Sequence, residues 1–111
     1  MRTALVVRLA AVSGAVAVAA GAFGAHGASG KAAEWLRTGA EYEMIHAVAA
    51  LVALRLLRAP LAAGLMLAGS ALFAATLYAM ALGAPHWLGA VTPLGGAAMI
   101  AGWLVLAIRR A

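Results

Sequence analysis

The chain has 111 residues, of which 67% are hydrophobic and 10% are charged. A soluble domain is about half apolar and about a quarter charged, so this composition excludes an ordinary soluble domain and favours lipid as the solvent. The formal net charge is +5, but the basic residues are spread over chain ends and loops, which argues against a nucleic-acid-binding surface. The absence of cysteine excludes disulfides, thiolate metal sites and cysteine nucleophiles. The length allows a single domain, covering residues 1–111.

The first apolar segment is predicted to form a transmembrane helix over residues 4–25. It supplies the ~20 apolar residues that a span of ~30 Å needs, provided that the Arg8 side chain extends to the membrane surface. A signal peptide is the alternative, because a basic start precedes an apolar stretch with sites such as Ala15-Val16-Ala17. The apolar run continues past these sites and no soluble domain follows it, so we favour the transmembrane helix.

Residues 27–39 are predicted to form a loop that carries a short interfacial helix between the first two transmembrane helices. Ser29 is a candidate cap for this short helix, and Trp35 would lie in the membrane interface. Thr38 and Glu41 then have the spacing of a capping box. We therefore expect the second transmembrane helix to cover residues 39–58.

The third helix is predicted over residues 61–82, after Pro60, with Gly83 as its stop signal. The fourth is predicted over residues 87–108, interrupted by Thr92-Pro93. Either the helix kinks at this pair, or it begins there with Thr92 as its cap. The second option leaves only about 24 Å of helix, so we favour the kink. The fold class expected is an all-α membrane protein, a bundle of four transmembrane helices.

Small residues recur along these helices at positions that would let helix backbones approach closely in lipid. The predicted packing positions are Gly14, Ala17, Gly21, Gly64, Gly69, Gly95 and Gly96. Stripes on the first and third helices leave faces free for a homo-oligomer or a larger membrane complex. The expected partners are thus the lipid bilayer and such an assembly, with no nucleic acid.

Charged residues are divided unevenly between the two ends of the predicted bundle. One end holds Arg2, Arg8, Arg55, Arg58, Arg109 and Arg110 with no acid, and the other holds Lys31 and Arg37 with Glu34, Glu41 and Glu43. The positive-inside rule places the arginine-rich end, and with it both termini, in the cytoplasm. We therefore expect a multi-pass protein of the inner membrane.

The polar residues of the second helix are the most informative ones. With a helix start near residue 39, Glu43 lies about 6 Å and His46 about 10 Å below the outer end, on a shared face. Ionisable groups at such depth turn inward and find partners. The sequence therefore predicts an outward-facing polar site formed by His26, Glu43, His46, Tyr78 and Thr92, with His86 as a further candidate.

Three interpretations of this site stay open. It can be a structural network that fixes the register of the helices, a proton or substrate site, or a metal or haem site. The Glu-x-x-His pair of Glu43 and His46 occurs once, whereas carboxylate metal sites use it twice, so no metal ligands and no cofactor are assigned. Away from the arginines, the inner half offers only Ser13, Ser70 and the Trp103 indole as polar side chains, which argues against a monomeric pore.

Several motifs follow one another along the chain. They are the GAFGAH hexapeptide at residues 21–26, Tyr42 with His46, Leu77-Tyr78, Thr92-Pro93-Leu94-Gly95-Gly96 and Gly102-Trp103. This series resembles the small membrane proteins grouped as domain of unknown function 423, or uncharacterised protein family 0382, whose vertebrate relatives are called transmembrane protein 256. The resemblance covers all four predicted helices. It implies a four-helix inner-membrane protein and no particular activity.

The function expected is non-enzymatic, because the chain has no nucleophile constellation, phosphate loop or carboxylate pair in an aqueous cleft. We expect a scaffold, a lipid-interacting module or an accessory subunit. The first alternative is a small transporter that uses Glu43 and His46 as a protonatable pair. The second alternative is a metal or haem binder.

Overall fold

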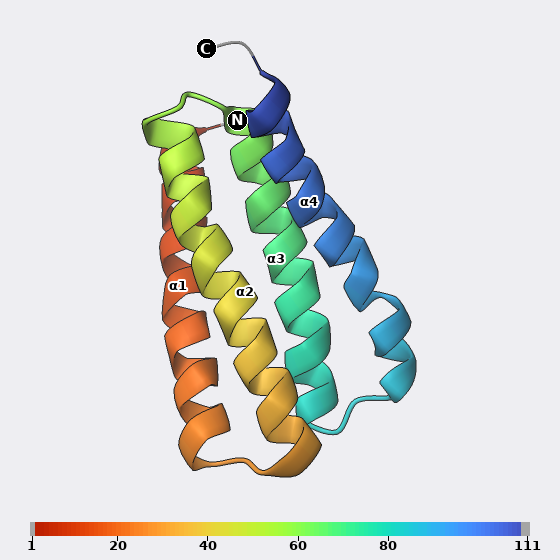
Figure 1. Ribbon diagram of the computed structural model, residues 1–111. Helices are drawn as coiled ribbons and strands as arrows, with labels where there is room; N and C mark the ends of the chain where they lie inside the picture. The colour runs from red at the N-terminus through yellow and green to blue at the C-terminus, as the bar shows by residue number, and fades with distance from the viewer. Residues whose placement is uncertain (1, 110–111) are drawn as a thin grey trace.

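The computed structural model describes residues 2–109 and is all-α, with four helices packed as a bundle. The elements are α1 (Thr3–His26), α2 (Gly30–Arg55), α3 (Pro60–Ala81), the short 3-10 helix η1 (His86–Ala90) and α4 (Thr92–Ile108). Figure 1 shows the helices running alternately up and down, in a body 44 Å long. The beginning of α1, the α2–α3 turn and the end of α4 share one end of the bundle. The other two connections share the opposite end, and Arg110 of the charge count lies outside the described residues.

The bounds of α3 follow from proline and glycine. Pro60 occupies the first position of α3, where its missing N–H costs nothing, and the helix stops just before Gly83. Gly83 has a φ of +104°, which is in the left-handed region that favours glycine. These two signals were read directly from the sequence.

The predicted short interfacial helix does not exist as a separate element, and this prediction was wrong. Residues 30–38 are the first turns of α2, so the predicted start near residue 39 is too late. The capping box fails with it, because Thr38 and Glu41 lie inside a continuous helix. The cause is packing: Leu36 is buried against α1, where a Cβ on Gly24 would lie 3.0 Å from the Leu36 Cβ. Ser29 does precede α2, but its side chain makes no capping hydrogen bond.

The predicted kink in the fourth helix is also corrected. Regular α-helix begins at Thr92, and the preceding residues form the separate helix η1. Pro93 has no N–H to offer the carbonyl one turn earlier, so an α-helix cannot continue through it without losing that bond. Thr92 is not a cap either, since its hydroxyl donates to the Leu88 carbonyl at 3.2 Å.

Each helix packs mainly against its neighbour in sequence, so the order in space is α1, α2, α3, α4. A core of mostly small buried side chains lies near the end that holds the beginning of α1. It contains Val6, Ala10, Ala50, Ala53, Leu54, Ala59, Ala62, Ala63, Met66 and Leu67. In lipid, such small residues stabilise a bundle by letting backbones approach, because apolar burial adds little there.

Within residues 2–109, three helical segments are long and apolar enough to cross a membrane. They are Thr3–His26, Pro60–Ala81 and His86–Ile108. The helix α2 carries more charged residues than these three segments, although it is the longest helix and packs between α1 and α3.

Candidate functional site

Glu43 is the centre of a hydrogen-bond network that joins three helices. Its side chain is 5% exposed. The Ser13 hydroxyl of α1 donates to Oε2 at 2.8 Å, and the Tyr78 hydroxyl of α3 donates to Oε1 at 2.7 Å. Both carboxyl oxygens accept a hydrogen bond, so the carboxyl group is held between α1 and α3. Among the described residues, no basic side chain forms an ion pair with this carboxylate.

The network lies near the middle of the bundle, deeper than the sequence predicted. Ser13 is about 15 Å along α1 from Thr3 and about 20 Å from His26. Glu43 is similarly about 20 Å from the start of α2 at Gly30. The predicted depth of about 6 Å was wrong because it assumed a helix start near residue 39.

Glu43 and Ser13 line a groove between α1 and α3 with a volume of about 400 Å³. Every other lining side chain is apolar or absent. These residues are Val6, Leu9, Val12, Val16, Gly64, Leu67, Ala68 and Ala71. The groove runs from Val6 to Val16 along α1, and its lining residues Val12, Val16 and Ala71 are exposed, so it is open on the side of the bundle. A carboxyl group therefore lies in an otherwise apolar groove.

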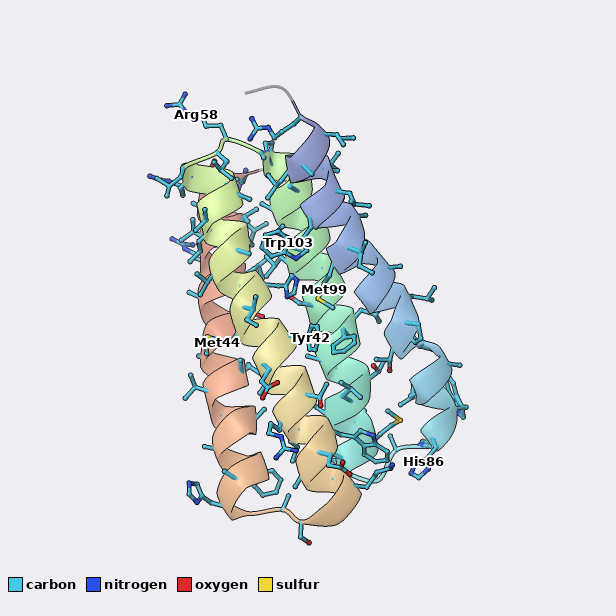
Figure 2. All side chains as sticks on the ribbon, in the orientation of Figure 1. Tyr42, Met44, Arg58, His86, Met99 and Trp103 are labelled. Atoms are coloured by element: carbon cyan, nitrogen blue, oxygen red, sulfur yellow. The ribbon has the colours of Figure 1, made fainter. Side chains whose placement is uncertain are left out.

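His46 belongs to a second network, one helical turn along α2. Its Nδ1 lies 2.7 Å from the Tyr42 carbonyl, and the Trp103 indole N–H of α4 donates to its Nε2 at 2.9 Å. An indole can only donate, so Nε2 is the acceptor and the proton sits on Nδ1. In Figure 2 the Trp103 side chain extends from α4 toward α2. His46 is thus a neutral ring whose two nitrogens are both engaged.

The remaining predicted site residues are not brought together with Glu43. His26 is exposed at the end of α1, and His86 packs edge-on against Trp35 with ring centroids 5.2 Å apart. Thr92 shares a 2.6 Å hydrogen bond with Thr76 between α4 and α3. The single polar site expected from the sequence is therefore divided into separate groups. Of the five predicted residues, only Glu43 and Tyr78 bond to each other.

The predicted packing positions also differ from one another. A Cβ on Gly69 would lie 2.8 Å from the Gly95 carbonyl oxygen, and one on Gly95 would lie 2.5 Å from the Gly69 carbonyl oxygen, so α3 and α4 touch through their backbones. Gly21 faces the Ala40 side chain at an ordinary distance, and Ala17 is buried. Gly14 has nothing within 4 Å of its Cβ position. Gly64 lines the groove, and Gly96 only reaches the Phe73 ring.

Sequence reasoning missed the two partners that matter most, Ser13 and Trp103. Both were noted as polar side chains in the inner half, and neither was assigned to the site. The available signal was their rarity, because a lone hydroxyl or indole within an apolar helix needs a partner. Gly39 was missed as well: a Cβ there would lie 2.7 Å from the Tyr78 ring, so glycine makes room for the side chain that reaches Glu43.

Comparison with known proteins agrees with the resemblance read from the motifs. The model of the family described as "Protein of unknown function (DUF423)" matches residues 20–96. The chain belongs to this family. A UPF0382 membrane protein of Haemophilus influenzae is 44% identical, over 89% of this chain and 87% of the relative. YwdK of Bacillus subtilis, also named a UPF0382 membrane protein, is 38% identical over 90% of each chain.

A further relative is named for its location. The UPF0382 inner membrane protein YgdD of Escherichia coli K12 is 37% identical, over 89% of this chain and 83% of the relative. The chain is thus a membrane protein of a family with no known activity. No solved structure matches it.

Proposed function

We propose that all four helices cross the inner membrane with both termini in the cytoplasm. The support for a fourth span is that α2 packs between α1 and α3 and connects the two ends of the bundle. Its outward positions Ile45, Val48 and Val52 are apolar and exposed, as a lipid-facing helix requires. The described arginines gathered at one end, among them Arg58 in Figure 2, support this orientation through the positive-inside rule.

The absence of cysteine makes this topology simple to test. A single cysteine at Ser29 marks the α1–α2 turn, and one at Leu57 marks the α2–α3 turn. We expect a membrane-impermeant maleimide to label Ser29→Cys on intact spheroplasts and Leu57→Cys only after lysis. Labelling of Leu57→Cys from outside would contradict the orientation.

For the function, we propose a non-enzymatic membrane protein that binds a compact molecule from the lipid phase in the α1–α3 groove. The groove carries this proposal, because about 400 Å³ is within the range of sites for small molecules. A phospholipid chain entering along the groove would place its methyl end on the Glu43 carboxylate, which is unfavourable. A shorter amphiphile avoids that contact.

The test is native mass spectrometry of the protein taken from its own membrane in nanodiscs. We expect a bound small molecule in the wild type and its loss in Ala68→Leu, which narrows the groove. The matched control is Ala97→Leu, at an exposed position of α4 outside the groove. Equal spectra for all three proteins would contradict the proposal. The same spectra report whether the protein is a homo-oligomer or carries a partner subunit.

A transporter is the second candidate, and the depth of Glu43 favours it. Carriers place coupling groups near the middle of the membrane, where Glu43 and Ser13 meet. Flux of protons or organic cations into proteoliposomes should then fall in Glu43→Gln. Unchanged flux in Glu43→Gln and His46→Ala would end this candidate. The metal or haem alternative gains no support from His46, because both ring nitrogens are engaged.

A further inference from the structure

We infer that the α1–α3 groove selects a lipophilic cation with an N–H donor, held by the Glu43 carboxylate. The inference rests on the proposed function, since it names the chemical class of the molecule that the groove would bind. It follows from the hydrogen bonds that Glu43 already makes, from the charge that they leave unpaired and from the shape of the groove.

The site offers acceptors and no free donor. A carboxylate has roughly four lone-pair positions, and Ser13 and Tyr78 use one on each oxygen. The hydroxyl protons of Ser13 and Tyr78 are both committed to Glu43. A ligand that needs donors, such as a quinone carbonyl, finds none at this position. A ligand that brings its own N–H finds acceptor capacity left on Glu43.

The charge of the site points to the same class. Ser13 and Tyr78 are neutral donors, so they stabilise the carboxylate without cancelling its charge. Ionisable groups within a membrane normally pair with an opposite charge, and a buried carboxylate without one is costly. No Lys, Arg or His of residues 2–109 pairs with Glu43. An ammonium group seated in the groove would supply the missing positive charge.

The shape of the groove fixes how such a cation would lie. Glu43 and Ser13 line the groove near the middle of the bundle, whereas Val6 and Gly64 line the part nearer the cytoplasmic end. The ammonium group would meet Glu43, and the hydrocarbon would extend along the apolar walls of α1 and α3. The lateral opening lets such a molecule enter from the bilayer without passing through water.

The experiment uses three photoreactive alkyl diazirines of equal chain length that end in a primary ammonium, a hydroxyl or a carboxylate. Each is added to the full chain in phosphatidylcholine nanodiscs, and labelled peptides of α1 and α3 are measured by mass spectrometry. We expect the ammonium probe to label the groove about tenfold more than the hydroxyl probe, and the carboxylate probe least. The net charge of +5 would by itself favour the carboxylate probe, so this order opposes the overall field.

Two variants separate this inference from the proposed function. In Glu43→Gln we expect the ammonium and hydroxyl probes to label within about twofold of each other. In Ala68→Leu none of the three probes should label the groove. In Ala97→Leu the three probes should label it in the same order as in the wild type. Equal labelling by the three probes in the wild type, or a preference for the carboxylate, would overturn the cation and leave the groove as a binding site. No groove labelling by any probe would overturn the proposed function itself. The wild-type order decides the question even if Glu43→Gln fails to fold.

Discussion

The helix α3 has two faces that are built differently. Toward α4 it is closed, because Gly69 and Gly95 bring the two backbones together and the Cβ of an alanine would clash at either position. Toward α1 it is open, although Gly64 and Ala68 are also small residues and line a groove of about 400 Å³. Small residues therefore permit a close approach between helices without causing it.

The difference lies in what each neighbouring helix packs against. The helix α4 has α3 as its main neighbour, whereas α1 packs on α2 and only touches α3. The Ser13–Glu43 hydrogen bond, which lies in the groove, links α1 to α2. One face of α3 thus serves stability, and we assign the other to binding.

The largest effect on stability is expected from a substitution that forces α3 and α4 apart. Gly95→Ala puts a methyl group within 2.5 Å of the Gly69 carbonyl oxygen, and overpacking of this kind lowers the free energy of unfolding by about 1–3 kcal/mol. Gly14→Ala is the control, because nothing lies within 4 Å of its Cβ position. Unfolding of both variants in mixed micelles measures the effect. Equal stability of the two would show that α3 and α4 are not in backbone contact.

The second largest effect is expected from breaking the hydrogen bond between Tyr78 and Glu43. Tyr78→Phe removes one donor from Glu43, and the loss of a hydrogen bond to a charged group should cost about 1–2 kcal/mol of unfolding free energy. Tyr42→Phe is the control, because the Tyr42 ring is exposed. The same unfolding assay applies. A larger loss for Tyr42→Phe would refute the assigned role of Tyr78.

The third effect concerns the link between α2 and α4. Trp103→Phe keeps an aromatic ring but removes the N–H that His46 accepts, at a cost of about 0.6 kcal/mol. Trp87→Phe, at an exposed position of η1, should change stability less. Nitrogen-15 spectra of His46 add a direct readout, with an unprotonated Nε2 whose shift moves in Trp103→Phe. A protonated Nε2 in the wild type would contradict the structure.

The smallest effect on stability is expected from a substitution in the groove on the α1 side of α3. Ala68→Leu adds volume to the open groove, so we expect the unfolding free energy to change by less than about 0.5 kcal/mol. The variant should lose the ligand and keep its fold. The same substitution in a packed core would destabilise the fold. A destabilisation comparable to that of Gly95→Ala would mean that the groove is closed in the membrane.

The all-α bundle of four helices followed from the sequence, because the lengths of the apolar segments predict it. Each apolar segment is long enough for a helix, and Pro60 and Gly83 mark the ends of α3 correctly. The start of α2 did not follow, because the packing of Leu36 on Gly24 overrides the local capping signal. An error of nine residues at that start then shifted the predicted depth of Glu43 by about 14 Å.

The candidate site was predictable only in part. Glu43 and Tyr78 were identified by their polarity within apolar helices, and the family was identified by its motifs. The partners Ser13 and Trp103 depend on how α1 and α4 are rotated and shifted against α2, which local sequence patterns do not encode. Periodicity says which residues share a face, and tertiary packing decides what that face meets.

The most direct measurement of the central claim is solid-state NMR of the carboxyl carbons of Glu34, Glu41 and Glu43 in bilayers. These three residues are all the acidic residues of the chain, so their signals can be assigned by single substitutions. We predict that Glu43 receives magnetisation from hydrocarbon protons through the groove, and that Glu34, exposed near the start of α2, receives it from water. A Glu43 carboxyl in contact with water and not with hydrocarbon would contradict a binding groove that is open to lipid.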